Sequence, residues 1–160
     1  MKAVVAYYSR TGNTAKAAKA ISEALGCETK KITDLKDRSG IFGFLSAGKD
    51  ATSKKPTRIK EGKTKRKSYD LYIVGTPTWG GNPCPAIRTY LSENKKKMKM
   101  AAFFCTAGGE NTENNLQELE KISGKKPIAV LSLRTEEVQK GAFEEKAKAF
   151  VRKIRANSKK

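Results

Sequence analysis

The sequence predicts an α/β fold, a three-layer sandwich in which a five-stranded parallel sheet of strand order 2-1-3-4-5 lies between helices. Two observations predict it. Five predicted strands alternate with five predicted helices along the chain. The first strand, residues 1–8, has a continuous apolar centre, which is typical of a strand covered on both faces. The length of 160 residues indicates one domain, residues 1–160.

The N-terminal half is expected to contain two strands and two helices. Residues 14–25 form a helix with one apolar face, and Gly26 is expected to end it. Residues 27–32 form a more polar strand, which suits an edge of the sheet. Residues 39–52 form a helix with irregular ends that crosses over the sheet, because glycines interrupt its apolar residues.

The apolar residues of segment 39–52 leave two interpretations open. They could cover the core, which is the usual place of such side chains. They could instead form a dimer contact or a hydrophobic wall beside a ligand. The residues concerned are Ile41, Phe42, Phe44 and Leu45.

The segment 49–67 is the most basic part of the chain. Nine lysines and arginines stand there against Asp50 and Glu61. The segment contains no aromatic residue, so it offers no platform for stacking bases. It is either a solvated loop whose charges repel one another or a docking surface for an acidic protein.

The C-terminal half is expected to alternate three strands with three helices. The last helix has an apolar face at helical spacing, which includes Phe143 and Phe150. The strands are expected at residues 71–74, 100–105 and 127–133, and the helices at residues 85–93, 113–122 and 143–154.

Three unusual loops follow the first, third and fourth predicted strands. In the order 2-1-3-4-5 these strands end together at the switch point, where an open α/β sheet binds its ligand. The first loop precedes a helix, so unpaired N–H groups and the helix dipole favour a phosphate there, with a plain helix cap as the alternative. The loops consist of Ser9, Arg10, Thr11, Gly12, Asn13 and Thr14; of Thr76, Pro77, Thr78, Trp79, Gly80, Gly81 and Asn82; and of Cys105, Thr106, Ala107, Gly108, Gly109 and Glu110.

These loops resemble those of the flavodoxin family, and the resemblance extends over nearly the whole chain. It implies a flavodoxin-like fold and FMN as a tightly but non-covalently bound cofactor. The first loop is similar to the family's phosphate loop, the second to the loop that packs on the inner part of the flavin ring, and the third to the other flavin-contacting loop. All residues of the three loops are therefore expected to bind the cofactor, and no catalytic residue or metal ligand is predicted.

Trp79 and Gly80 have the most specific expected roles. Trp79, the only tryptophan, offers a face for stacking on the flavin, and a place in the core is the alternative. In flavodoxins a peptide at the matching place turns its carbonyl toward the flavin N5–H once the ring takes one electron. The resemblance assigns this carbonyl to Gly80, although a tight turn would also require glycine at positions 80 and 81.

The third loop departs from the family, which often has an aromatic residue here on the outer face of the ring. No aromatic residue lies between positions 105 and 110, so that face is expected to be open to solvent or covered by a partner. This leaves room for a flavoprotein that admits a substrate. Glu110 either bonds the pyrimidine end of the ring or is a favourable acid at the start of the next helix.

The three cysteines are widely spaced, and the chain contains no histidine. This excludes a His-containing metal or catalytic site and fits neither a zinc motif nor a dense disulfide framework. Cys27 is expected to be structural and Cys105 to line the site. Cys84 is expected to be exposed and prone to oxidation.

The formal net charge of +18 comes from 34 Lys and Arg against 16 Asp and Glu. Such a charge attracts anionic partners. Nucleic acid is not expected as a partner, because the basic residues lack aromatics and a reading motif. The expected partner is a redox protein with an acidic docking face, and the chain is expected to be a monomer or a homodimer.

The predicted function is that of an FMN-binding flavodoxin, a low-potential electron carrier between redox proteins. The alternative is an FMN-dependent NAD(P)H:quinone-type oxidoreductase. No apolar run approaches the length that spans a bilayer, and a strand rather than a signal peptide occupies the N-terminus. The protein is therefore expected to be soluble, without a membrane span, and cytoplasmic.

Overall fold

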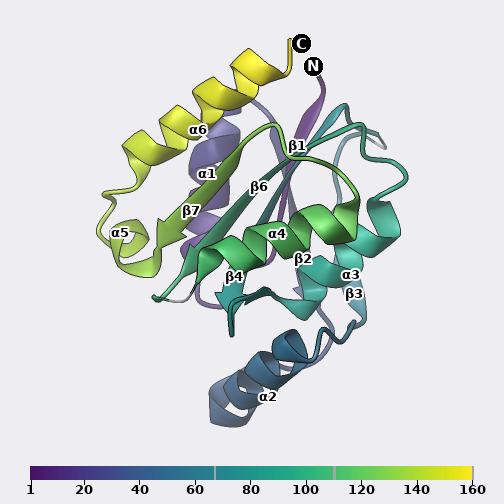
Figure 1. Ribbon diagram of the computed structural model, residues 1–160, viewed down its shortest axis with the longest axis vertical. Coiled ribbons are helices and arrows are strands. Elements are labelled where there is room, and N and C mark those ends of the chain that lie inside the picture. Colours follow the sequence, from purple (N-terminus) through teal and green to yellow (C-terminus); the bar gives the residue numbers. More distant parts are fainter. Residues whose placement is uncertain (67, 110, 160) are drawn as a thin grey trace.

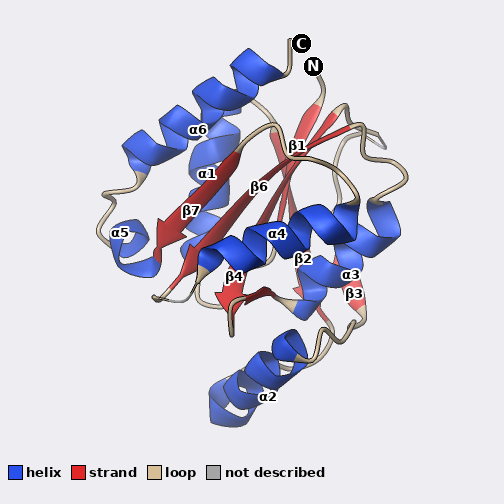
Figure 2. Cartoon of the chain, viewed as in Figure 1, coloured by secondary structure: helices blue, strands red, loops and turns tan. Residues whose placement is uncertain are grey.

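The structure, a computed structural model, describes residues 1–66, 68–109 and 111–159. A twisted sheet forms its centre, and helices cover both faces (Figure 1). Figure 2 separates the two kinds of element by colour. The strands are β1 (Ala3–Tyr7), β2 (Glu28–Asp34), β3 (Ile59–Glu61), β4 (Leu71–Trp79), β5 (Asn82–Pro83), β6 (Met100–Ala107) and β7 (Val130–Arg134). The helices are α1 (Asn13–Leu25), α2 (Gly40–Thr52), α3 (Pro85–Asn94), α4 (Thr112–Ser123), α5 (Thr135–Gln139) and α6 (Glu144–Asn157).

Within the described residues the sheet contains seven strands in the order β3-β2-β1-β4-β6-β7, and β5 pairs with β4. The α/β class and a mostly parallel sheet are confirmed, but the prediction of five strands in the order 2-1-3-4-5 is wrong in strand number and order. β3 and β5 are the additional strands, and both pair antiparallel. They contain three and two residues, too few to show the alternation that predicts a strand.

The polar strand β2 does not lie at the edge of the sheet. Its residues 32–34 pair with β3, so the expected edge position is wrong. The predicted basic loop 49–67 thus contains both the end of α2 and a short strand. Lys67 lies outside the described residues.

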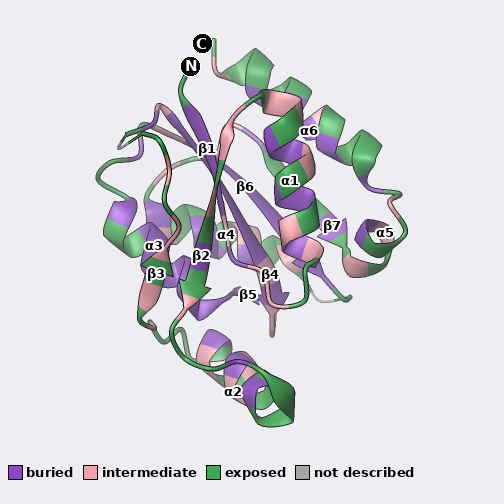
Figure 3. Cartoon of the chain, turned by 180° about the vertical axis from the view of Figure 1, so that it is seen from behind, coloured by how far each residue is buried: buried purple, intermediate pink, exposed green. Residues whose placement is uncertain are grey.

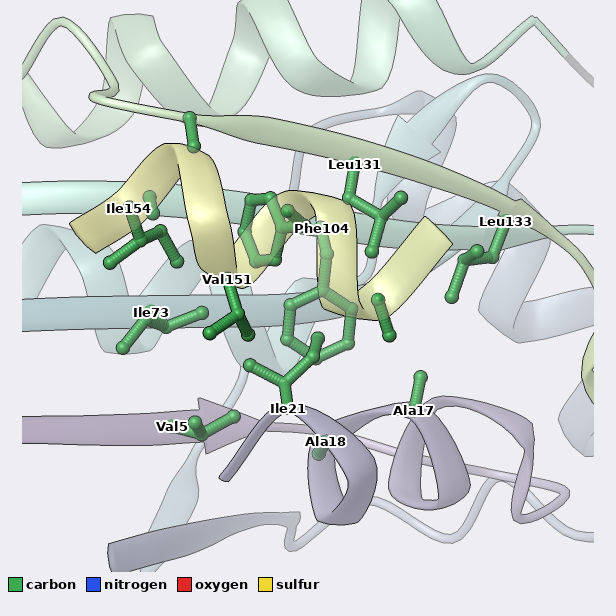
Figure 4. Packing of buried hydrophobic residues seen from close by; sticks show 14 of the residues in the cluster. Val5, Ala17, Ala18, Ile21, Ile73, Phe104, Leu131, Leu133, Val151 and Ile154 are labelled. Carbon is green, nitrogen blue, oxygen red and sulfur yellow. The ribbon is translucent and has the colours of Figure 1, made fainter. Parts of the chain in front are cut away.

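Two apolar layers hold the helices to the sheet. On one face Ile73 and Phe104 pack with Ile21 of α1, and α6 closes the same layer (Figure 4). On the other face Phe103 packs in a second cluster with Ile87 of α3 and with α4. Successive residues of β6 therefore face opposite layers, as the pleat of a strand requires.

Helix α2 lies outside these layers and projects from the end of the sheet (Figure 1). Its large apolar residues are exposed: Ile41 by 78%, Phe42 by 87%, Phe44 by 59% and Leu45 by 61%. Figure 3 shows the exposed side of this helix. The interpretation in which these residues cover the core is therefore wrong.

The buried side of α2 consists of small residues. Gly43, Ala47 and Ala51 recur at helical spacing and face the rest of the molecule. A Cβ atom at Gly43 would lie 2.3 Å from the backbone carbon of Arg38, so only glycine permits this approach. The sequence therefore places its small residues against the molecule and its large ones in solvent.

A buried arginine fixes α2 to the end of β2. Arg38 is 5% exposed, and its guanidinium donates from Nε to Asp34 Oδ2 at 3.0 Å and from Nη1 to Asp50 Oδ2 at 2.6 Å. Lys36 Nζ donates to the same Asp50 oxygen. Hydrogen bonds from Lys36 and Arg38 hold the pKa of Asp50 below its ordinary value.

Among the described helices, none combines the length and the apolar character needed to cross a bilayer.

Candidate functional site

The three predicted loops meet where β1, β4 and β6 end. Together they line a cavity of about 170 Å³. Residues from all three loops face it, joined by one residue of α2 and one of α5. The lining residues are Arg10, Thr11, Asn13, Thr14, Phe44, Pro77, Thr78, Trp79, Thr106, Ala107, Gly108 and Thr135.

The remaining predicted residues that the structure describes lie around this cavity rather than on its wall. Thr76, for example, is fully buried, and its Oγ1 accepts from the Cys84 N–H at 3.1 Å, so it shapes the second loop. Glu110 lies outside the described residues, and both interpretations of its role stay predictions. The others of this group are Ser9, Gly12, Gly80, Gly81, Asn82, Cys105 and Gly109.

The first loop leaves the start of α1 available to an anion. Gly12, with φ of +96°, occupies the N-cap and offers no side-chain acceptor to the first turn of the helix. Ser9 Oγ accepts from the Gly12 N–H at 3.1 Å, which tightens the loop before the helix begins. The N–H groups of the first turn have no intrahelical partner, so this geometry favours the phosphate interpretation over a plain side-chain cap.

A buried hydrogen bond joins the first and third loops. Thr14 Oγ1 and Thr106 Oγ1 lie 2.8 Å apart, and both residues are almost fully buried. Arg10 instead turns toward α2: its Nε donates to the Arg38 carbonyl at 3.0 Å, and its guanidinium lies 5.1 Å from the centre of the Phe44 ring. The first loop therefore contacts both the sheet and α2.

The second loop forms a tight turn between β4 and β5. Gly80 and Gly81 both have positive φ, so the turn interpretation of this pair is confirmed. The Gly80 carbonyl accepts from Asn82 Nδ2 at 2.9 Å. Its predicted swing toward a flavin stays a prediction, and this hydrogen bond would have to break for it.

The position of Trp79 agrees in part with both interpretations from the sequence, a place in the core and a face at the site. It packs against the core, and its ring meets the Tyr8 ring edge-on, with centroids 5.7 Å apart and planes at 89°. It is nevertheless only half-buried and lines the cavity. Burial raises the pKa of the neighbouring Tyr8 hydroxyl, so this phenol stays protonated.

All three cysteines lie in the described part of the chain, and none of them lines the first cavity. Cys105 is buried, and this burial raises the pKa of its thiol to about 11. Cys84 is also buried, with its thiol pKa raised to about 12, so the expected exposure and sensitivity to oxidation are wrong. The pairing of β5 with β4 explains this, because it brings Cys84 beneath Thr76.

Sequence reasoning missed two lining residues, Phe44 and Thr135. Phe44 belongs to the helix for which a hydrophobic wall was one of two interpretations, so a partial signal existed. Thr135 begins the short helix α5, which the sequence did not predict. Both come from elements other than the three loops.

A second cavity of about 160 Å³ adjoins the first. It lies between α2 and the turn after β4, and Phe44 and Trp79 line both cavities. Its other lining residues are Leu45, Ala47, Gly48 and Gly80.

The residues of the first cavity fit a phosphate attached to a planar ring. The start of α1 and the hydroxyl groups of Thr11 and Thr14 suit a phosphate. The Trp79 ring suits a flat aromatic system, and Gly108 adds no side chain that would obstruct it. FMN has both of these parts.

The fold and this site define a class, the flavodoxin-like flavoproteins. A flavoprotein in complex with FMN from Lactobacillus acidophilus NCFM is 24% identical, with a TM-score of 0.71, over 88% of this chain and 98% of that chain. A WrbA-like flavodoxin from Agrobacterium tumefaciens is 18% identical, with a TM-score of 0.63, over 99% of this chain and 98% of that chain. Oxidised Flavodoxin 2 from Bacillus cereus is 17% identical, with a TM-score of 0.56, over 98% of this chain and 99% of that chain. At these sequence identities, the similarity shows only that the proteins share a fold.

A family model narrows this class. The model of NADPH-dependent FMN reductases matches residues 2–123, and the chain belongs to this family. No curated protein sequence matches the chain significantly. The family confirms the predicted cofactor, FMN. The resemblance to flavodoxins is confirmed for the flavodoxin-like group, but not for the flavodoxin family itself.

Proposed function

We propose that this protein is an FMN-dependent oxidoreductase that oxidises NAD(P)H and reduces a small planar acceptor of the quinone type. This is the alternative function from the sequence rather than the electron carrier. One observation carries it. The third loop contributes only Thr106, Ala107 and Gly108 to the cavity wall, so no aromatic side chain of that loop obstructs the approach of NAD(P)H to the ring. Membership of a reductase family supports the same function.

The residues of the chain bind and orient the reactants. FMN, when bound, supplies a group that accepts two electrons and passes them on. The first turn of α1 would hold its phosphate, and the Thr14–Thr106 hydrogen bond keeps two of the loops together. Trp79 and Phe44 provide apolar walls that keep water from the ring.

The overall reaction balances without an acid from the cavity wall. NADPH loses a hydride and becomes NADP⁺, and the quinone gains two electrons and two protons, one of them from solvent. None of the described lining residues is acidic, so solvent is the proton donor. We therefore expect no steep pH dependence of kcat near neutral pH.

The test is NADPH oxidation by the FMN-loaded protein with 1,4-naphthoquinone as acceptor. Rapid turnover without a second protein is the expected result, followed by the absorbance of NADPH. Protein that binds FMN but transfers electrons only when a redox protein is added would contradict the enzyme and support the carrier.

The net charge of +18 favours a second candidate, a cytoplasmic electron carrier that docks on an acidic redox protein. The exposed lysines of segment 49–67 would form part of such a surface. For this candidate, electron exchange with an acidic partner slows steeply as salt is added, because salt screens the attraction. A rate independent of salt would exclude it.

A further inference from the structure

The exposed apolar residues of α2 lie directly beside the candidate site. Phe44 and Leu45 are more than half exposed, yet both line the second cavity together with Trp79. Clustered apolar side chains in solvent commonly mark a binding surface. Because the two cavities share Phe44 and Trp79, a molecule in the second cavity would lie next to the ring of the cofactor.

The second cavity has the size of a small aromatic molecule. Its volume is about 160 Å³. An apolar protein cavity of roughly 150 Å³ is known to bind benzene. Two of its lining residues, Phe44 and Leu45, are more than half exposed, so the cavity is open to solvent and a second fused ring could extend outward. The dimensions therefore suit a molecule of one or two rings.

Small residues provide this space. Gly48 sits in the middle of α2 and lines the cavity, and a Cβ atom there would meet no other atom within 4 Å. Helix interiors disfavour glycine by about 1 kcal/mol relative to alanine, and nothing in the packing around Gly48 requires it. The glycine keeps open a space that any larger side chain would occupy.

A charged group of the first cavity contacts Phe44, which lines both cavities. The Arg10 guanidinium is 5.1 Å from the centre of the Phe44 ring. A cation beside the wall that the two cavities share suits a ligand with an apolar body and electron-rich carbonyl oxygens. A quinone has this combination, and the cavity described here is otherwise apolar.

We propose that the cavity between α2 and Trp79 is the binding site for the quinone that this protein reduces, with Phe44 and Leu45 as its walls and Gly48 as its floor. The inference rests on the proposed function and names the acceptor site that this function requires. It also assigns a role to the exposed side of α2.

Binding is tested on the FMN-loaded protein without NADPH, so that no turnover occurs. 1,4-Naphthoquinone is titrated while the backbone amides of α2 and the indole N–H of Trp79, the only tryptophan, are followed by NMR. We expect saturable shifts at Phe44, Gly48 and Trp79. Shifts confined to the third loop, or no saturable shift, would overturn the proposal.

Gly48→Leu is the decisive variant. It should fold, because leucine favours a helix and the added atoms enter open space. We expect at least tenfold weaker naphthoquinone binding with an unchanged affinity for FMN. Lys49→Leu is the matched control: it adds the same side chain one residue later, at an exposed position outside the cavity lining, and should bind naphthoquinone within twofold of the wild type. Equal binding by wild type and Gly48→Leu would refute the site.

The same experiments separate this inference from the proposed function. Turnover of naphthoquinone without shifts in α2 would support the proposed reductase function and refute the cavity as the quinone site. Saturable shifts in α2 without NADPH oxidation would leave a quinone site on a protein that is not the proposed reductase, and the inferred role as acceptor site would then be wrong.

Discussion

At the scale of single residues, burial determines how firmly the cysteine thiols hold their protons. Cys84 and Cys105 illustrate this, because a thiol in an apolar environment holds its proton more firmly than one in water. Their pKa values are raised to about 12 and about 11. Cys27, which is only partly buried, also has its pKa raised, to about 11, by burial and then by Glu28.

These thiols should react slowly in the native protein. At pH 7.5 we expect Cys84 and Cys105 to resist iodoacetamide, because both are inaccessible and protonated. Mass spectrometry of the alkylated protein measures the rates, and protein in denaturant is the control in which all three cysteines react. Rapid native labelling at Cys84 would show that the region around β5 opens.

The same shifts predict how stability depends on pH. Each thiol binds its proton more tightly when folded than when unfolded, so the folded state retains protons that the unfolded state loses. The free energy of unfolding should therefore be highest below the unfolded thiol pKa of about 8.5 and fall as the pH rises toward 11. Urea unfolding at several pH values measures this, and replacing Cys105 with alanine should flatten the decline.

The sequence predicted most of the residues that line the site but missed Phe44 and Thr135. Thr14, Trp79 and Thr106 were predicted because loops after the inner strands of a doubly wound sheet converge. Phe44 was left open because an apolar residue at helical spacing looks the same whether it faces the core or solvent. Burial depends on where the whole helix lies, and that position is set by Arg38 and Gly43, which are not large apolar residues.

At the scale of elements, α2 shows how a helix can be held although its buried face contains only small residues. Its position depends on Arg38, whose partners Asp34 and Asp50 belong to β2 and α2. The side chains of Arg38 and Asp34 are 4% and 2% exposed, so the charges are shielded from water. Removing one member of such a group leaves the others buried without a counter-charge.

Arg38→Ala should therefore destabilise the protein by about 3–5 kcal/mol. Urea unfolding measures the loss, and hydrogen exchange should show the largest gain in α2. Arg58→Ala, at an exposed position nearby, is the control and should change stability by less than about 0.5 kcal/mol. Equal effects of both variants would mean that the buried ion pairs do not hold this helix.

The packing of β4 against β6 requires a residue without a side chain at position 75. A Cβ atom on Gly75 would lie 2.0 Å from the ring of Phe104. Gly75→Ala should cost about 1–3 kcal/mol through overpacking. The double variant Gly75→Ala with Phe104→Leu should recover part of the loss, because the two residues are coupled. Additive losses in the unfolding free energies would contradict this contact.

For the whole molecule, the parallel centre of the sheet was predictable because buried strands have continuous apolar sequences. The polar strand β2 was placed wrongly, since its partner β3 lies in a lysine-rich segment without a strand pattern. β5 contains only two residues and depends on the turn at Gly80 and Gly81. Such short pairings follow from tertiary structure rather than from local sequence.

The net charge of +18 should affect the bound flavin. A positive field stabilises an anionic reduced flavin, so we expect it to raise the reduction potential of bound FMN. Added salt screens the field and should lower the potential. Redox titrations at low and high ionic strength measure both effects. A potential that does not change with ionic strength would contradict the expectation.

Both ends of the described chain lie side by side at the edge of the sheet opposite α2 (Figure 1). A short tether at either end would therefore attach the protein to an electrode with the cofactor loops facing the electrolyte. In that orientation, dissolved acceptors would have free access while the conducting surface remained a molecule's length away.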